Sequence, residues 1–392
     1  MSHLLIAHSP DLKRLQDEGY DIEVRSGYLL VTHVPYVNSR KEIEYGTLVS
    51  VLDLAGNVTA KPGNHVVEFI GDHPCNKDGS KMDKIANASA QKQLADNLVV
   101  NHTFSSKPVN GDYPDYFEKI TAYVNMISNQ ARSLNPDVTA KTFPVIAAVP
   151  EESVFEYIDT ASSRAEIGQV TSKLEIEKVA IVGLGGTGAY VLDLVAKTPV
   201  KEIHLFDGDK FSQHNAFRSP GAPSVDELRE ESKKVDYYKK QYSKMRRNIF
   251  AYDCYVDDSN INLLREMNFV FLCLDKAEPK KLIIEALEEC GISFIDVGMG
   301  IFHVNGALQG ILRTTTSTAN TRDHAKGYIS FGDEDDNNEY ASNIQVADLN
   351  ALNAALAVIK WKKLFGFYQD TKNEYHATYT LDGNMLLNDY LL

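Results

Sequence analysis

A glycine-rich segment is the clearest place in this sequence to look for chemistry. It lies between an apolar run and an amphipathic one and contains Gly183, Gly185, Gly186 and Gly188. Glycines let the backbone turn tightly and approach a phosphate without an intervening Cβ, while the following helix offers free N–H groups and its positive end. The segment therefore predicts a site for an anionic phosphate, with a purely structural turn as the alternative.

Two carboxylates follow the glycines. Asp207 comes directly after the apolar run 202–206, and Asp209 stands two residues later. A carboxylate about 20 residues beyond such glycines typically accepts hydrogen bonds from ribose hydroxyls. The segment thus predicts a nucleotide, and to this point a nicotinamide dehydrogenase fits equally well.

Donor side chains come next, at Asn215, Arg218 and Lys234. A triphosphate requires donors of this kind, because a guanidinium group matches phosphate oxygens in a bidentate way. These residues therefore favour a triphosphate over a dinucleotide. For Lys234 the alternative is a solvated helix face, since several other lysines surround it.

Asp275 ends the apolar run 269–274, at the edge of the expected sheet where ligands bind in such folds. A magnesium ion on phosphates would use a carboxylate of this kind. The alternative is an N-cap for the helix that begins near Glu278.

In their order these residues resemble the ThiF-type adenylyltransferases, which are relatives of the ubiquitin-activating enzymes. The resemblance spans about residues 164–364 and rests on a GxGGxG loop, an Asp-x-Asp pair, an Asn-x-x-Arg, a lysine and a later aspartate. It implies ATP and Mg²⁺ as cofactors. It also implies that Arg218 and Lys234 bind phosphates and that Asp275 holds the magnesium ion.

Two departures and one further residue accompany the resemblance. The family's Gln after the arginine is Ser219 here, and its Asn after the metal aspartate is Lys276, which puts those two contacts in doubt. Arg164 resembles an arginine that family dimers contribute to the neighbouring active site, which implies a homodimer. A surface role is the alternative for Arg164.

The reaction implied is adenylation of the C-terminal carboxylate of a ubiquitin-like or sulfur-carrier protein, of the type that ends in Gly-Gly. The resemblance also places the partner's tail at the acidic loop 322–339, for which a solvated loop is the alternative. Two other functions stay open: an NAD-binding Rossmann oxidoreductase and a non-catalytic nucleotide-binding scaffold. If the chain were an oxidoreductase, the presence of Arg218 and Asp275 at these positions would be a coincidence.

In many relatives a thioester on an enzyme cysteine follows adenylation. Cys75 is the residue we expect to carry it here, because it follows His73 and Pro74 in a polar loop. Cys254, Cys273 and Cys290 are expected in the core. An incidental loop cysteine is the alternative for Cys75.

The pattern of apolar runs predicts two domains. Residues 160–392 are expected to form a Rossmann-like, doubly wound, mainly parallel α/β sheet, and residues 1–150 a smaller α+β domain. The smaller domain resembles the ubiquitin-conjugating folds in outline, with a different spacing. The expected strands and helices of the larger domain are 178–182, 189–196, 202–206, 225–247, 249–256, 268–274, 278–290, 293–297, 305–314 and 344–364.

Composition narrows the class of protein. The chain has 392 residues, enough for about two cores, and a formal net charge of -14. That charge argues against nucleic acid and anionic membrane surfaces as partners. Neither a signal peptide nor a membrane span is expected, and four widely spaced cysteines without a CxxC pair fit the cytoplasm.

Overall fold

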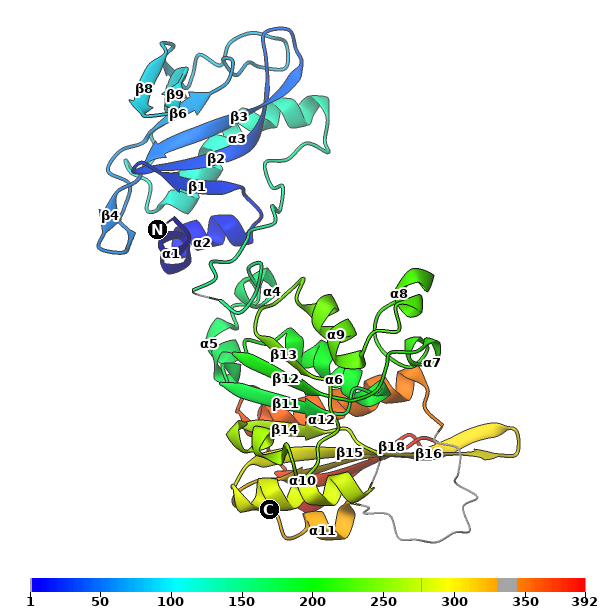
Figure 1. Cartoon of the computed structure of the whole chain (residues 1–392). Coiled ribbons are helices and arrows are strands. Elements are labelled where there is room, and N and C mark those ends of the chain that lie inside the picture. Colours follow the sequence, from blue (N-terminus) through cyan, green and yellow to red (C-terminus); the bar gives the residue numbers. More distant parts are fainter. Residues whose placement is uncertain (1, 152, 276, 330–343, 392) are drawn as a thin grey trace. The chain divides into compact units, whose positions relative to one another are not determined.

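The computed structural model describes every residue except 1, 152, 276, 330–343 and 392 (Figure 1). The chain divides into two compact units, Met1–Ile146 and Ala147–Leu392. Each unit has its own sheet and its own apolar core. Among the described helices, none is both long enough and apolar enough to cross a lipid bilayer.

The first unit is built on an antiparallel sheet in the order β1-β2-β3-β6-β10-β7. Its strands are β1 (Ile22–Arg25), β2 (Tyr28–Val37), β3 (Ile43–Val51), β6 (Val66–Ile70), β7 (Ala86–Ala88) and β10 (His102–Ser105). Two small hairpins pair β4 (Leu54–Ala55) with β5 (Val58–Thr59) and β8 (Lys92–Ala95) with β9 (Leu98–Val100). The helices are α1 (Ser2–His8), α2 (Pro10–Asp17) and α3 (Tyr116–Leu134).

Helix α3 closes the core of this unit. Its N-cap is Asp115, whose Oδ1 accepts a hydrogen bond from the Glu118 N–H at 2.8 Å. Its buried face, including Ile120 and Tyr123, belongs to the same apolar cluster as residues of β2 and β6. The unit is therefore mainly antiparallel sheet, and the likeness to ubiquitin-conjugating folds stays a prediction.

The second unit is built on an eight-stranded sheet in the order β13-β12-β11-β14-β15-β16-β17-β18. Its strands are β11 (Lys178–Val182), β12 (Glu202–Phe206), β13 (Ile249–Tyr252), β14 (Phe269–Leu272), β15 (Ser293–Val304), β16 (Ala307–Ser317), β17 (Glu374–Thr380) and β18 (Met385–Leu391). Its helices are α4 (Thr160–Arg164), α5 (Gly168–Thr171), η1 (Ser172–Leu174), α6 (Gly186–Ala196), α7 (Gln213–Ala216), α8 (Val225–Arg229), α9 (Lys234–Tyr242), η2 (Ile261–Glu266), α10 (Ala277–Glu289), α11 (Ala325–Tyr328) and α12 (Ala347–Leu364).

The sheet of this unit is mixed. The five strands from β13 to β15 run parallel in the strand order of a Rossmann sheet, and the Rossmann-like α/β class is thereby confirmed. The expected mainly parallel sheet needs a correction, because β16, β17 and β18 extend it in antiparallel fashion. The antiparallel direction of β16 has a local cause. Asn305 and Gly306 both have positive φ, so a tight hairpin joins β15 to β16.

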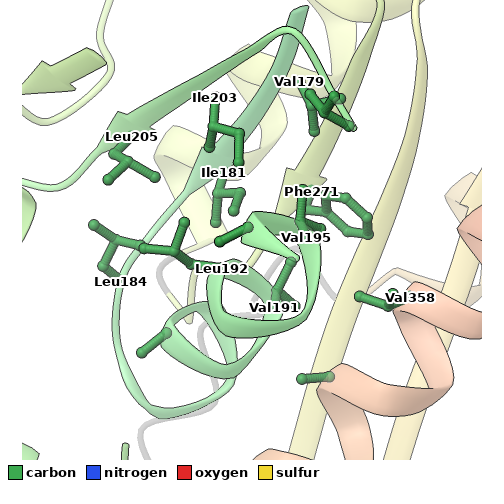
Figure 2. Packing of buried hydrophobic residues seen from close by; sticks show 14 of the residues in the cluster. Val179, Ile181, Leu184, Val191, Leu192, Val195, Ile203, Leu205, Phe271 and Val358 are labelled. Carbon is green, nitrogen blue, oxygen red and sulfur yellow. The ribbon is translucent and has the colours of Figure 1, made fainter. Parts of the chain in front are cut away.

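Apolar side chains cover both faces of the sheet. On one face, Val191, Leu192 and Val195 of α6 pack against strand residues such as Ile181, and Val358 of α12 belongs to the same cluster (Figure 2). On the other face, α10 and η2 pack in a second cluster. Two covered faces are what a parallel sheet requires, and they leave the ends of the strands free to form a site.

The prediction of one long helix over 225–247 is wrong, because the chain forms two helices, α8 and α9, with a break between them. The Phe211 N–H donates to the Ser232 carbonyl at 2.8 Å, and Lys233 is extended with φ -61° and ψ 145°. Pairing with the segment after β12 therefore outcompetes continued helix. The break makes Lys234 the first residue of α9.

Candidate functional site

A cavity of about 980 Å³ lies at the carboxyl ends of the parallel strands. Its lining includes the turn after β11, the ends of β12 and β14, and parts of β15, β16 and α12. Connections leave β11 and β14 in opposite directions across the sheet, which is the switch point where ligands bind in open α/β sheets. Eight of the residues singled out in the sequence for chemistry line it together: Gly183, Gly185, Gly186, Asp207, Asp209, Arg218, Lys234 and Asp275.

Two glycines of the turn after β11 are required by the chain itself. Gly183 has φ +90°, and a Cβ there would lie 2.6 Å from the Cys273 carbonyl oxygen. A Cβ on Gly188 would lie 1.9 Å from the Gly183 carbonyl oxygen. These two glycines allow the turn and α6 to pack closely on the sheet.

The middle glycines meet different surroundings. A Cβ on Gly186 would lie 2.0 Å from Asn350 Nδ2, so this glycine makes room for a neighbouring side chain. A Cβ on Gly185 would meet nothing within 4 Å, although Gly185 lines the cavity. Within the described chain, no packing contact requires a glycine at 185. A ligand that approaches the backbone there would supply the reason.

Helix α6 begins at this turn. Gly185 is its N-cap and offers no side chain to accept from the first N–H groups. Gly186 and Thr187 of the first turn line the cavity. Uncapped N–H groups and the positive end of an eleven-residue helix favour an anion at this position.

Asp207 ties the glycine turn to the end of β12. Its Oδ2 accepts from the Leu184 N–H at 2.7 Å, and its Oδ1 accepts from the Asp209 N–H at 2.8 Å. The residue is only 8% exposed. Both oxygens therefore help to shape the turn, and a ribose contact by Asp207 stays a prediction.

Lys234 is buried between the two carboxylates. Its Nζ lies 2.7 Å from Asp209 Oδ2 and 3.5 Å from Asp207 Oδ2, and the residue is 5% exposed. The alternative interpretation, that Lys234 belongs to a solvated helix face, is thus wrong. The neighbouring Lys233 is partly exposed. Lys234 presents a fixed positive charge to the cavity, because two carboxylates hold its ammonium group.

Asp209 has a second partner. The Tyr255 hydroxyl donates to Asp209 Oδ1, and this bond raises the pKa of Tyr255 to about 12. Tyr255 also lines the cavity. Sequence reasoning missed this tyrosine because it lies 46 residues beyond Asp209 and follows a different strand.

Asn215 and Arg218 have different surroundings. Asn215 is 2% exposed and closes a capping box, because its Oδ1 accepts from the Ser212 N–H at 2.8 Å. It is not among the residues that line the cavity. Arg218 does line the cavity, and its Nε is buried without a hydrogen-bond partner among the described residues. A buried donor of this kind needs an acceptor, which an anionic ligand would provide.

Asn350 of α12 joins the glycine turn to the arginine turn, and sequence reasoning missed it. Its Oδ1 accepts from the Thr187 hydroxyl at 2.9 Å, while its Nδ2 donates to the Arg218 carbonyl at 3.0 Å. It is 1% exposed. An asparagine on a helix more than 130 residues away carries no local sign of this role.

Asp275 lies three residues beyond the end of β14, is exposed and lines the cavity. No group of three or more His, Cys, Asp or Glu side chains in the described part of the chain is arranged to hold a metal ion. Magnesium bound with nucleotides typically uses only one or two carboxylates, with phosphates and waters as the remaining ligands. One exposed carboxylate beside a phosphate-type site therefore fits Mg²⁺.

Arg164 ends the short helix α4, whose N-cap is Asp159. Its side chain is exposed and is not among the residues that line the cavity of this chain. An exposed position is compatible with a role toward a second copy. That role stays a prediction.

Cys75, in the first unit, is buried rather than displayed in a polar loop. It is 1% exposed, its Sγ donates to the His73 carbonyl at 3.2 Å, and burial raises the pKa of its thiol. Burial and a raised pKa both oppose a nucleophilic role. In contrast, Cys290 is exposed, so the expectation that the other three cysteines are all core residues is wrong.

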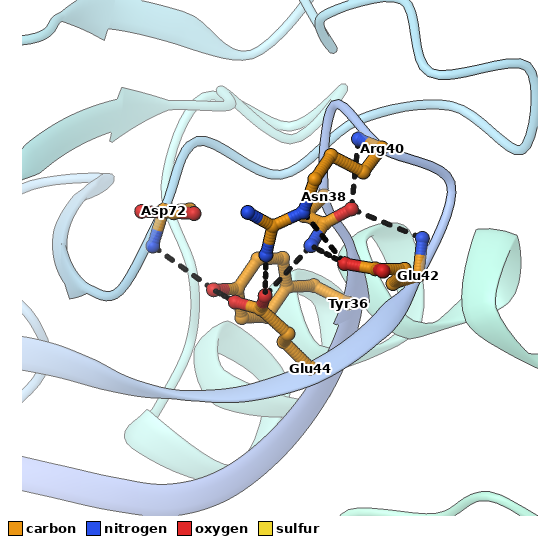
Figure 3. A network of polar contacts seen from close by, with 6 residues as sticks. All are labelled: Tyr36, Asn38, Arg40, Glu42, Glu44 and Asp72. Atoms are coloured by element: carbon orange, nitrogen blue, oxygen red, sulfur yellow. Dashed lines mark hydrogen bonds and ion pairs between the residues drawn. The ribbon is translucent and has the colours of Figure 1, made fainter.

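A polar network fixes the segment that contains Cys75 (Figure 3). The Tyr36 hydroxyl donates to Glu44 and accepts from the Asp72 N–H at 2.9 Å. The Cys75 N–H donates to the Val37 carbonyl at 2.7 Å. The segment is therefore held against β2 at Asp72 and at Cys75 itself.

Comparison with known families agrees with this geometry. The model of the ThiF family matches residues 160–384, more than half of the chain. The chain belongs to the ThiF family. Residues 10–160 match a second family, described as a domain of unknown function (DUF6791). The ThiF match covers all of the cavity-lining residues named above.

Curated relatives of this ThiF-family chain include two proteins named ubiquitin-like modifier-activating enzyme 5. The protein of Drosophila ananassae is 21% identical over 208 residues, which cover 50% of this chain and 52% of that protein. The protein of Aedes aegypti is 22% identical over 162 residues, which cover 38% of this chain and 41% of that protein. The chain thus spans about half or less of the length of these relatives.

Solved structures similar to the chain include E. coli MccB in a crystal with ATP, at 18% identity and a TM-score of 0.46 over 59% of this chain and 70% of that one. PaaA is also similar, at 14% identity and a TM-score of 0.44 over 57% of this chain and 76% of that one.

Proposed function

We propose that this ThiF-family chain uses ATP to adenylate the C-terminal carboxylate of a partner protein or peptide. The observation that carries the proposal is Arg218, whose buried, unpartnered Nε lines the same cavity as Lys234 and the uncapped start of α6. Three sets of N–H donors around one cavity suit a triphosphate better than a dinucleotide. The partner class proposed is a ubiquitin-like or sulfur-carrier protein that ends in Gly-Gly.

In the reaction, one oxygen of the partner's carboxylate attacks the α-phosphorus of ATP. The new bond joins the acid to the phosphorus, and the bond to the bridging oxygen of the β-phosphate breaks. Pyrophosphate leaves with that electron pair, and the acid becomes an acyl-adenylate. No proton transfer is needed, so catalysis rests on position and charge.

The chain's own residues supply both the positioning of the reactants and the neutralising charge. Gly185 lets the nucleotide approach the backbone, and the first turn of α6 donates N–H groups to phosphate oxygens. Two of the three N–H donors of Lys234 point to Asp209 and Asp207, which leaves one for a phosphate oxygen. Arg218 neutralises the charge that develops during attack.

Asp275 would hold the magnesium ion together with phosphate oxygens of ATP. Mg²⁺, when bound, would neutralise charge on the departing pyrophosphate. The side chain of Asp275 is exposed in the cavity lining, where such an ion has access to water for its remaining ligands.

We also propose that the active form is a homodimer in which Arg164 acts at the partner copy's site. The exposed position of Arg164 at the end of α4 permits this. The homodimer rests on the family resemblance alone and is tested separately below.

The experiment is ATP–pyrophosphate exchange with purified carrier proteins that end in Gly-Gly. We expect exchange only when protein, carrier and Mg²⁺ are all present, and none with the same carrier lacking its last glycine. Thermal unfolding with ATP or with NAD provides the second measurement, because a ligand stabilises the state that binds it. A larger shift with NAD would support the oxidoreductase, and ATP binding without exchange for any carrier would support the scaffold.

A further inference from the structure

A second charged cluster lines the cavity beyond the residues assigned to the nucleotide. Lys280 of α10 and Arg313 of β16 share one carboxylate, that of Asp296 in β15. Lys280 Nζ lies 2.8 Å from Asp296 Oδ1, and Arg313 Nη2 lies 3.0 Å from Asp296 Oδ2. Asp296 is fully buried, and Lys280 is 4% exposed. We call these three residues the Arg313 cluster.

The Arg313 cluster has an excess of one positive charge. Two cations share a single carboxylate, and neither Cys273 nor His376 adds a negative charge at neutral pH. Burial raises the pKa of the Cys273 thiol, and burial together with Arg313 lowers the pKa of His376 to about 4. A buried excess charge is costly unless a counter-ion approaches it.

Arg313 is also short of a hydrogen-bond acceptor. Its Nη2 is paired with Asp296, but its Nε is buried without a partner among the described residues. Its side chain keeps 21% exposure and lines the cavity. The guanidinium is therefore held by one carboxylate, and its exposed part faces the cavity.

The backbone of β15 makes room for this guanidinium. A Cβ on Gly298 would lie 2.7 Å from Arg313 Nη2 and 3.0 Å from Nε, so the group lies over Gly298 itself. Gly300, which also lines the cavity, has nothing within 4 Å of its Cβ position. Gly298 pairs with Arg313 and Gly300 with Ile311, so Gly300 is a side-chain-free position next to the guanidinium on the same face of β15.

The order of strands places the Arg313 cluster relative to the nucleotide residues. Asp207 follows β12, the glycine turn follows β11, and Asp275 follows β14. The next strands, β15 and β16, hold Asp296 and Arg313. Neighbouring strands are about 4.8 Å apart. The strands of Asp296 and Arg313 are one and two strands beyond β14, which precedes Asp275, and two and three strands beyond β11, which precedes the glycine turn.

We propose that Arg313, held in place by Asp296 and Lys280, binds one oxygen of the partner's terminal carboxylate and leaves the other oxygen to attack the α-phosphate. The last residues of the partner lie extended over Gly300 of β15, next to the guanidinium. This inference rests on the proposed adenylation and names the residues that select its acyl substrate. Arg313 is a binding residue, and Asp296 and Lys280 are positioning residues.

The chemistry selects a carboxylate and small residues. A guanidinium that faces the cavity distinguishes an acid from its amide, because only the acid offers a negative charge. Gly300 leaves backbone without a side chain next to this guanidinium, which suits a glycine at the end of the partner. A bulky last residue would meet the backbone of β15.

The test uses N-acetyl-glycylglycine and its C-terminal amide as probes. Each is titrated into the whole chain with Mg²⁺ and a non-hydrolysable α,β-methylene ATP analogue, and binding is followed by ligand-observed NMR. We expect the acid to bind the wild type about tenfold more tightly than the amide, as a hydrogen bond to a charged group predicts. Arg313→Met should reduce that ratio to about one.

Matched variants separate a binding role from a structural one. Arg313→Lys keeps the charge and should retain part of the preference for the acid, while Gly298→Ala should lower it by displacing the guanidinium. Lys281→Met is the control, because Lys281 is exposed on α10 and does not line the cavity. If Arg313→Met does not fold, Gly298→Ala and Arg313→Lys decide the question.

Three outcomes overturn the proposal: equal binding of acid and amide by the wild type, a preference for the acid that survives Arg313→Met, or an affinity for the ATP analogue that falls together with that preference. The last would assign Arg313 to the phosphates. Failure of the proposed function is seen separately, as a wild type that does not bind the ATP analogue.

Discussion

The two units of this chain differ in where their polar side chains find partners. In the first unit they pair with one another: Tyr36, Asn38, Arg40, Glu42 and Glu44 form a closed network (Figure 3). Lys119 is 1% exposed, and burial lowers its pKa to about 8. In the second unit, charged residues from several strands converge on one cavity of about 980 Å³.

Sheet topology explains the contrast. In an antiparallel sheet, neighbouring strands end on opposite edges, so hairpins and local pairs satisfy the polar groups. In a parallel sheet, all carboxyl ends share one edge, where helix N-termini add positive potential. The second unit therefore concentrates unpaired donors at one place. The predictions below test that difference, from the largest expected effect to the smallest.

Arg218→Ala should lower ATP–pyrophosphate exchange by roughly 10²–10³-fold, because it removes a donor aimed at developing charge. The unfolding midpoint should barely change, since its Nε has no hydrogen bond to lose among the described residues. Arg229→Ala is the matched control, an exposed arginine paired only with exposed Asp226. Equal loss in both variants would contradict the assignment.

Asp275→Asn should lower exchange by roughly 10²-fold and shift the Mg²⁺ requirement to higher concentration, because it removes the metal's carboxylate. Removing Mg²⁺ with a chelator should abolish the wild-type activity. Asp258→Asn, at another exposed position of the same unit, is the control. Unchanged exchange and Mg²⁺ dependence in Asp275→Asn would reduce Asp275 to a helix cap.

Gly185→Ala and Gly188→Ala should separate ligand binding from packing. A Cβ at 185 has no atom of the described residues within 4 Å, so this variant should fold normally but bind ATP about tenfold more weakly. A Cβ at 188 meets the Gly183 carbonyl oxygen, so the free energy of unfolding should fall by roughly 1–3 kcal/mol. Urea unfolding and ATP titration of both variants provide the measurements. Normal ATP affinity in Gly185→Ala would show that no phosphate approaches position 185.

Arg164→Ala and Arg218→Ala, each inactive as pure dimers, should recover about a quarter of wild-type exchange when mixed. Random mixing makes about half of all dimers mixed, and each mixed dimer contains one intact site, formed by Arg218 of one copy and Arg164 of the other. Mixing two samples of the same variant is the control. No recovery in the mixed sample would place Arg164 outside any shared site.

Cys75→Ser should have the smallest effect, because the Cys75 thiol is buried and its pKa is raised. We expect iodoacetamide at neutral pH to modify Cys290 and leave Cys75 unmodified in the folded protein, as peptide mass spectrometry can show. Any thiol-sensitive carrier conjugate on a non-reducing gel should survive Cys75→Ser. Loss of the conjugate would instead support Cys75 as the thioester residue.

The sequence determined the local parts of the nucleotide site. Strands 178–182 and 202–206 have the predicted bounds, because short apolar runs between turn residues have few alternatives. The glycine turn and Asp207 lie within 25 residues of each other, and their spacing fixes a strand, a turn and a helix. A motif of this size is specified by neighbours along the chain.

Tertiary structure decided the contacts between distant segments. Arg313 meets Asp296 only because the Asn305-Gly306 hairpin sets the register of β15 and β16. Asn350 reaches Thr187 across 163 residues because α12 packs beside α6. The break before Lys234 depends on pairing with the segment after β12, and the burial of Cys75 depends on contact with β2. None of these has a local pattern, because the free energy that fixes them comes from packing between segments far apart in the sequence.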